Sequence, residues 1–225
     1  MFITQICNKY CLFVLTTCSK FGIFDMLGSL KAALKFCLEG NLMDVKLTRA
    51  QSFGQWLKIR RLYRLAFPRA ERKPFSAILK IHRSNRGDVW YCTVDGHFAG
   101  FASTVRGGEL VLVDYLAVSP AMRDGGIGSA ILGELRNKYP EQHLFLEIES
   151  VWEDVPDRDA RLRRKAFYLR NGFTPMKLMI WLFGVKMEVL GIDCTMDYSQ
   201  YHDFYHTYLS PWAAEHISED VHPEA

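Results

Sequence analysis

No apolar run in this sequence reaches the roughly 20 residues that a membrane-spanning helix needs. With 16 glycines and 8 prolines in 225 residues, the composition excludes a fibrous chain or one dominated by linkers. The dinucleotide fingerprint G-x-G-x-x-G and the Walker loop are also missing. We therefore expect no membrane partner, and any nucleotide-like ligand must bind through a different loop.

Metal and disulfide chemistry have little support in the sequence. Four of the six cysteines lie within the first 37 residues, at no zinc-like pair spacing. A chain of this length folds without disulfides, so we expect reduced thiols and a cytoplasmic protein. His202 and His206 are four residues apart but lack a third ligand, so we predict no metal. Cys92 is a poor nucleophile candidate, because it is expected in mid-strand with no base beside it.

Charge is distributed unevenly along the chain. The formal net charge is only +3, which predicts no strong attraction to nucleic acid or membrane. Residues 43–191 carry 24 basic and 16 acidic side chains, whereas residues 192–225 carry seven acids and no Lys or Arg. A basic body suits an anionic ligand such as a phosphorylated cofactor; the alternative is an unevenly charged surface.

The hydrophobic pattern divides the chain into three parts. A globular pattern opens at Met43, and we assign residues 43–190 to one domain. We expect residues 1–42 to be an N-terminal extension outside that domain, with a packed accessory helix or an export or membrane signal as alternatives. Residues 191–225 form an acidic, aromatic, helical extension, whose Tyr198, Tyr201, Tyr205, Tyr208 and Trp212 fall at helical spacing. This stripe is typical of a helix face that packs on a core rather than of a ligand cage.

Within the domain, alternating and helical periodicities predict a mixed α/β fold whose early hairpins are antiparallel. Asp95-Gly96 and Gly107-Gly108 mark two of the turns. The predicted strands are 45–47, 89–94, 97–104, 110–118, 143–149, 177–183 and 185–190. The predicted helices are 52–67, 74–82, 127–139 and 160–170.

A glycine-rich turn joins the buried strand 110–118 to the helix that follows it. The turn reads Arg123-Asp124-Gly125-Gly126-Ile127-Gly128-Ser129. The free N–H groups at a helix start carry partial positive charge, and glycine lets a pyrophosphate approach the backbone closely. The turn therefore predicts a phosphate site, with a simple helix cap as the alternative.

These residues resemble the GNAT N-acetyltransferase family. Its cofactor signature is Arg or Gln, two residues, Gly, one residue, then Gly or Ala, and Arg123 to Gly128 match it in full. Leu116-Ala117-Val118 is similar to the family's Leu-Ala-Val strand. Phe167-Tyr168 with Gly172-Phe173 is similar to a second family motif. The resemblance covers roughly Met43 to Leu190.

The resemblance implies a fold and a cosubstrate. The fold is a central mixed, mostly antiparallel sheet of six to seven strands flanked by about four helices, here with a C-terminal helix in addition. The cosubstrate is acetyl-CoA. Its pantetheine arm would face the backbone of Leu116, Ala117 and Val118, and its pyrophosphate would bind the signature residues. Those residues are Arg123, Asp124, Gly125, Gly126, Ile127, Gly128 and Ser129.

The resemblance also implies catalytic roles. Tyr168 would protonate the departing thiolate, or would only pack above the cofactor. Glu147 would be the general base, because Leu146-Glu147-Ile148 looks like the family's Leu-Glu-Val strand. Glu149 and Asp114 stay open as alternative bases, and structural hydrogen bonding is the alternative for all three. The backbone N–H of Val118 would polarise the thioester carbonyl.

One departure concerns the helix that carries Tyr168. Many members have Asn and Ala seven and four residues before this Tyr, where this sequence has Arg161 and Arg164. The resemblance therefore does not extend to contacts between that helix and the cofactor. The basic run Arg161 to Lys165 suggests a solvated face balanced by nearby acids, or a contact with phosphate or RNA.

We expect a cytoplasmic acetyl-CoA-dependent N-acetyltransferase that acts by direct attack in a ternary complex. The acceptor is an amine, small-molecule in preference to protein or tRNA-linked, and the chain is a monomer or homodimer. Phe67 to Phe75, with Glu71, lies where the family builds its acceptor pocket. The alternative is a non-catalytic acyl-CoA-binding or interaction module.

Overall fold

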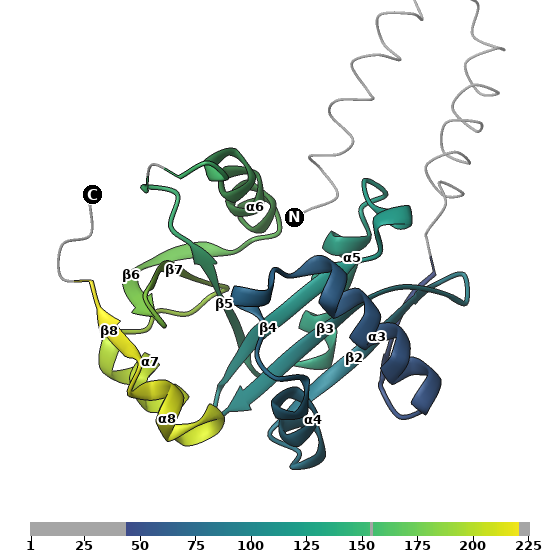
Figure 1. Ribbon diagram of the computed structural model, residues 1–225, viewed down its shortest axis with the longest axis horizontal. Helices are drawn as coiled ribbons and strands as arrows, with labels where there is room; N and C mark the ends of the chain where they lie inside the picture. The colour runs from purple at the N-terminus through teal and green to yellow at the C-terminus, as the bar shows by residue number, and fades with distance from the viewer. Residues whose placement is uncertain (1–43, 154, 221–225) are drawn as a thin grey trace, which may run out of the picture. The chain divides into compact units, whose positions relative to one another are not determined.

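A computed structural model describes residues 44–153 and 155–220 of the chain (Figure 1). The predicted extension 1–42 therefore lies outside the described residues. No described helix is both long enough and apolar enough to cross a membrane.

An eight-stranded mixed sheet organises the described part of the chain. Its order is β1-β2-β3-β4-β5-β7-β6-β8, and every neighbouring pair is antiparallel except β4 and β5. The strands are β1 (Val45–Arg49), β2 (Gly87–Val94), β3 (His97–Gly107), β4 (Leu110–Val118), β5 (His143–Glu149), β6 (Thr174–Leu182), β7 (Val185–Gly191) and β8 (Ile217–Glu219). The predicted mixed, mostly antiparallel sheet is confirmed, and β8 is a strand that the sequence did not predict.

Helices follow the predicted positions to within a few residues. They are α3 (Phe53–Ala66), α4 (Phe75–Arg83), α5 (Ile127–Lys138), α6 (Arg158–Arg170), α7 (Tyr198–Phe204) and α8 (Pro211–Ala214). Helix α3 begins at a capping box, in which Ser52 accepts the Gln55 N–H and the Gln55 side chain accepts the Ser52 N–H. A single 3-10 turn, Arg69–Glu71, lies between α3 and α4.

Both faces of the sheet are covered. On one face, α5 packs Ile127, Ile131 and Leu135 into a cluster with alternate residues of β4 and β5. On the other face, α3 and α4 cover β2 to β4, and the C-terminal segment covers β5 to β7. The alternation predicted for β5 is confirmed, because Leu144 lies in the α5 cluster and Phe145 in the C-terminal one.

The C-terminal segment folds back onto the sheet (Figure 1). Tyr201 and Tyr205 are fully buried, and β8 pairs with β6. The tyrosine stripe is thus core-facing, as predicted. Trp212 is not, since it is 61% exposed and its ring lies tilted beside that of Phe183, with centroids 5.4 Å apart. The helical segment closes with a π turn at Tyr205–Leu209 and ends at Ser210, whose backbone is extended, so Trp212 belongs to the separate helix α8 and does not continue the predicted face.

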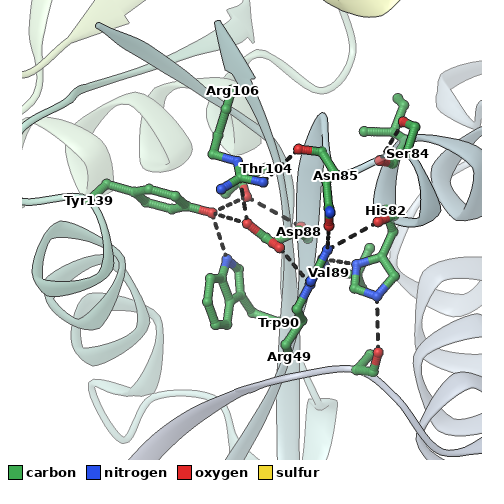
Figure 2. Close-up of polar contacts among 12 residues, drawn as sticks. Arg49, His82, Ser84, Asn85, Asp88, Val89, Trp90, Thr104, Arg106 and Tyr139 are labelled. Carbon is green, nitrogen blue, oxygen red and sulfur yellow. Dashed lines mark hydrogen bonds and ion pairs between the residues drawn. The ribbon is translucent and has the colours of Figure 1, made fainter. Parts of the chain in front are cut away.

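A buried carboxylate ties together the N-terminal half of the sheet (Figure 2). Asp88 on β2 accepts a hydrogen bond from the Tyr139 hydroxyl at 3.0 Å, and its Oδ1 lies 2.7 Å from Arg49 Nε. The Tyr139 oxygen in turn lies 2.7 Å from Thr104 Oγ1 and accepts the Trp90 indole N–H at 3.1 Å. This network joins β1, β2 and β3 to the end of α5, and so fixes the helix whose start carries the glycine-rich turn.

Candidate active site

Strands β4 and β5 pair over only part of their length. The ladder runs from Leu110 to Leu112, opposite His143 to Phe145, and stops there. Beyond it, β5 continues against β7, and among the described strands none pairs with residues 113–118 of β4 on the β5 side. Backbone groups along that edge, including those of Leu116, Ala117 and Val118, are therefore available to a ligand.

A β-bulge lies where the two strands part. Ser103 pairs with Tyr115 and Thr104 with Val113, which leaves Asp114 as the extra residue of β4. A bulge redirects side chains and increases local twist. It turns the Asp114 carboxylate, whose side chain is only 4% exposed, toward Lys73.

The glycine-rich turn has the geometry of an anion site. Gly126 caps α5 with a positive φ of 74°, and Asp124 has a φ of 66°. The first hydrogen bond into the helix runs from Ala130 N–H to Gly126 C=O. The amides of Ile127, Gly128 and Ser129 precede that bond and form none to a described residue. Unpaired amides at an exposed helix start fit a pyrophosphate.

The fold brings the two family-like motifs together. A Cβ added at Gly128 would lie 3.0 Å from the Phe167 ring and 3.8 Å from Val118 Cγ2. Phe167 and Tyr168 pack on the same cluster as Leu116 and Val118. The glycine turn, the free edge of β4 and the Tyr168 helix thus adjoin one another.

Tyr168 packs between two phenylalanine rings and carries a hydroxyl that stays protonated at neutral pH. Its ring packs edge-on against Phe167 and Phe173, with centroids 5.1 and 5.6 Å away. The hydroxyl forms no hydrogen bond to a described residue. Burial raises the pKa of Tyr168 to about 12, so the phenol keeps its proton at neutral pH.

Glu147 is held by two phenols from the C-terminal segment. The hydroxyls of Tyr201 and Tyr205 both donate to Glu147 Oε1, at 2.7 and 2.8 Å. Its Oε2 forms no hydrogen bond to a described residue, and this oxygen is not completely buried. Burial raises the pKa of Glu147, while the Tyr201 hydroxyl, the Lys73 ammonium and the Tyr205 hydroxyl lower it. One oxygen is therefore anchored and the other is left to accept a proton.

The other two base candidates are neutralised by cations. Asp114 Oδ1 lies 2.6 Å from Lys73 Nζ. Glu149 lies 2.6 Å from Arg164 Nη1 and 3.5 Å from Arg161 Nη2. Glu147 forms no ion pair with a described residue. A carboxylate bound to a neighbouring cation is a weaker base, so this arrangement favours Glu147.

The basic run on α6 holds a loop in place. Arg161 is 8% exposed, and its guanidinium donates to Ser150 C=O and to Glu153, both at 3.0 Å. Lys165 pairs with Glu188 at 2.7 Å. Acidic side chains balance the basic run, as the first of the two alternatives predicted. That alternative also predicted a solvated face, which is wrong for Arg161, because this side chain is buried. At the position where many family members have Asn, this side chain ties the start of α6 to the end of β5.

Three residues near Glu147 were not predicted as parts of the site: Lys73, Tyr201 and Tyr205. The tyrosine stripe was the only sequence signal for two of them, and it indicated burial without identifying the carboxylate. Lys73 comes from the segment between α3 and α4, where an acceptor pocket was expected. Among the described residues, no three His, Cys, Asp or Glu side chains group as metal ligands.

Part of the chain is similar to known acetyltransferases. Residues 85–175 match the family model described as an acetyltransferase (GNAT) domain. YjbC of Bacillus subtilis, whose name is that of an acetyltransferase, is 34% identical over 114 residues, which cover 48% of this chain. They cover 52% of YjbC, so the match spans about half of that relative.

Two solved structures share the fold. A GNAT-family protein of Bacteroides thetaiotaomicron superposes with a TM-score of 0.58 at 20% identity, covering 73% of this chain and 97% of its own. The ribosomal-protein-S18-alanine N-acetyltransferase of Escherichia coli superposes with a TM-score of 0.51 at 17% identity, covering 68% and 95%. Together with the separation of β4 from β5 and the glycine turn, these findings place residues 85–175 in the GNAT acetyltransferase family.

Proposed function

We propose that this domain transfers the acetyl group of acetyl-CoA to a primary amine, by direct attack within a ternary complex. The observation that carries the proposal is the carboxylate of Glu147, anchored through Oε1 only, beside an edge of β4 that no other described strand covers. The Escherichia coli neighbour is named for acetylating an alanine amine, which is the same reaction class.

The chain's own groups fit the cosubstrate. The amides of Ile127, Gly128 and Ser129 would bind the pyrophosphate, and the β4 edge from Leu116 to Val118 would bind the pantetheine arm. Acetyl-CoA supplies the acetyl group as an activated thioester. The Val118 N–H would donate to the carbonyl oxygen as negative charge grows there.

Glu147 would prepare the amine. An ammonium has no lone pair, so a proton must leave before nitrogen can form the new C–N bond. Glu147 Oε2 accepts that proton directly or through one water, while Oε1 stays fixed by Tyr201 and Tyr205. The raised pKa of Glu147 makes the carboxylate a stronger base than an exposed glutamate.

Tyr168 would complete the proton balance. As the C–S bond breaks, its hydroxyl donates a proton to the departing sulfur and takes one back from solvent afterwards. A phenol of pKa about 12 gives up a proton to an alkyl thiolate against the equilibrium, so it acts through placement beside the sulfur.

Turnover of the purified protein tests the proposal. Acetyl-CoA is mixed with a panel of polyamines, amino acids and peptides, and both free thiol and N-acetyl product are measured. We expect Tyr168→Phe to lower kcat by about 10²-fold or more, with the Kd for acetyl-CoA within twofold of the wild type. Binding without turnover across the panel and in extracts of small metabolites would indicate a non-catalytic acyl-CoA module. Full turnover by Tyr168→Phe would remove Tyr168 from the mechanism.

A further inference from the structure

A cationic hollow lies beside the proposed acceptor site. It measures about 570 Å³ and is bounded by α3 and by the segment that leads into α4. Five of its eight lining residues are cationic, and none is acidic: Arg60, Arg64, Arg69, Arg72 and Lys73. We refer to these five residues and the space between them as the arginine hollow.

The charges of the arginine hollow are largely uncompensated. Of its five cations, only Lys73 forms an ion pair with a residue that the structure describes. Arg72 Nε is buried and donates no hydrogen bond to any residue within 44–153 or 155–220. The arginines of α6 and β1 behave differently, since Arg161 and Arg49 both contact carboxylates.

Grouping these side chains has a cost that a ligand can remove. Arg60 and Arg64 are four residues apart on α3, so they project from the same side of the helix and repel each other. A buried guanidinium N–H without an acceptor adds a desolvation penalty. A bound anion reduces both the repulsion between the guanidinium groups and this desolvation penalty. The planar guanidinium fork matches phosphate oxygens with paired hydrogen bonds.

The arginine hollow is connected to the site of the chemistry. Lys73 lines the hollow, while its ammonium lies 2.6 Å from Asp114 and 6.0 Å from the centre of the Tyr205 ring. Tyr205 donates its hydroxyl to Glu147. Tyr63, also in the lining, donates to the Lys73 carbonyl at 3.0 Å. Lys73 therefore links the lining of the hollow to the groups that surround Glu147.

We infer that the arginine hollow binds a phosphate group of the acceptor, so that the acceptor is a small phosphorylated amine. This inference rests on the proposed function, because it names the substrate class of the same site. A phosphate carries up to two negative charges, and so neutralises more of the four unpaired arginines than a carboxylate does. The volume matches a small-molecule pocket.

Binding of inorganic pyrophosphate is measured by calorimetry, with no turnover required. The Gly126→Glu background removes the pyrophosphate site expected at the glycine turn. In that background, Arg64→Gln/Arg69→Gln is compared with Arg61→Gln/Arg163→Gln, two exposed arginines outside the hollow with the same total charge change. We expect the first pair to weaken pyrophosphate binding at least tenfold, and the second less than twofold.

Other outcomes overturn the inference. They are equal losses in both double variants, no pyrophosphate binding in folded protein, or a short single-stranded RNA that binds more tightly with a steep salt dependence. The last result would identify a nucleic-acid-linked acceptor instead. Acetyl-CoA binding and turnover of unphosphorylated amines by the wild type report on the proposed function independently, so the two failures are distinguishable.

Discussion

The contact of Tyr201 and Tyr205 with one oxygen of Glu147 gives a prediction about the pH dependence of catalysis. Burial raises the pKa of Glu147, and the two donated hydrogen bonds oppose that rise by favouring the carboxylate. Replacing either phenol by phenylalanine removes one donor and leaves the ring. The pKa of Glu147 should then rise further, and more alkaline conditions should be needed to deprotonate it.

The size of the change follows from the hydrogen bond that is lost. A hydrogen bond to a charged group contributes about 1.5–3 kcal/mol. Since about 1.4 kcal/mol corresponds to one pKa unit, each variant should move the pKa of Glu147 upward by about 1–2 units. Tyr201→Phe and Tyr205→Phe should therefore shift the acid limb of kcat/KM to higher pH by that amount. The alkaline plateau should change much less.

The assay is thiol release from acetyl-CoA with the best amine of the panel, measured from pH 5 to pH 10. Tyr208→Phe is the matched control, because this tyrosine belongs to the same segment and does not contact Glu147. Its profile should superpose on that of the wild type. An acid limb that stays in place in both Tyr201→Phe and Tyr205→Phe would refute the assignment of Glu147 as the base.

Three further predictions concern binding and stability. Gly126→Glu places a charged side chain in the anion site, at a residue whose φ is 74°. It should weaken acetyl-CoA binding by a factor of more than about ten, which corresponds to a loss of about 1.4 kcal/mol in binding free energy. Gly133→Glu, on the same helix with open space around it, should not change the affinity in calorimetry. Asp88→Asn should lower the free energy of unfolding by about 1–3 kcal/mol, because it removes the charge that Arg49 and Tyr139 contact. Urea titration measures this, and an unchanged midpoint of unfolding would show that the network does not contribute to stability. The free energy of unfolding of Glu147→Gln should rise relative to that of the wild type as the pH increases above 4.5, the ordinary pKa of Glu. The reason is that the pKa of Glu147 is raised in the folded state, so the wild type loses stability when this carboxyl is deprotonated. A difference in stability between the two proteins that is constant with pH would contradict the burial argument.

Much of the fold could be predicted because local patterns agree with the long-range packing. Leu110 to Val118 is almost wholly apolar, and the strand is covered on both faces. The strand His143–Glu149 alternates, and its two sets of side chains enter different clusters. The glycine turn was recognisable because close backbone approach and a positive φ restrict which residues can occupy it.

The partners of the buried charges could not be predicted. The sequence showed that Asp114 in an apolar strand needs a partner, but Lys73 lies 41 residues away and is paired through the fold. Tyr201 and Tyr205 are 54 and 58 residues from Glu147. Helical periodicity identifies the face that is buried, not the group on the facing strand. The extended Ser210, which ends the helix before the exposed Trp212, has no signal in the hydrophobic pattern.

Thermal unfolding with and without acetyl-CoA tests the central claim most directly, because it needs no knowledge of the acceptor. Acetyl-CoA at 100 times its Kd should add about 2.7 kcal/mol of stability, a rise in Tm of roughly 5–10 °C for a chain of this size. The shift should disappear in Gly126→Glu and persist in Gly133→Glu. If folded wild-type protein shows no shift at millimolar acetyl-CoA, the glycine turn is only a helix cap and the acetyl-transfer account is wrong.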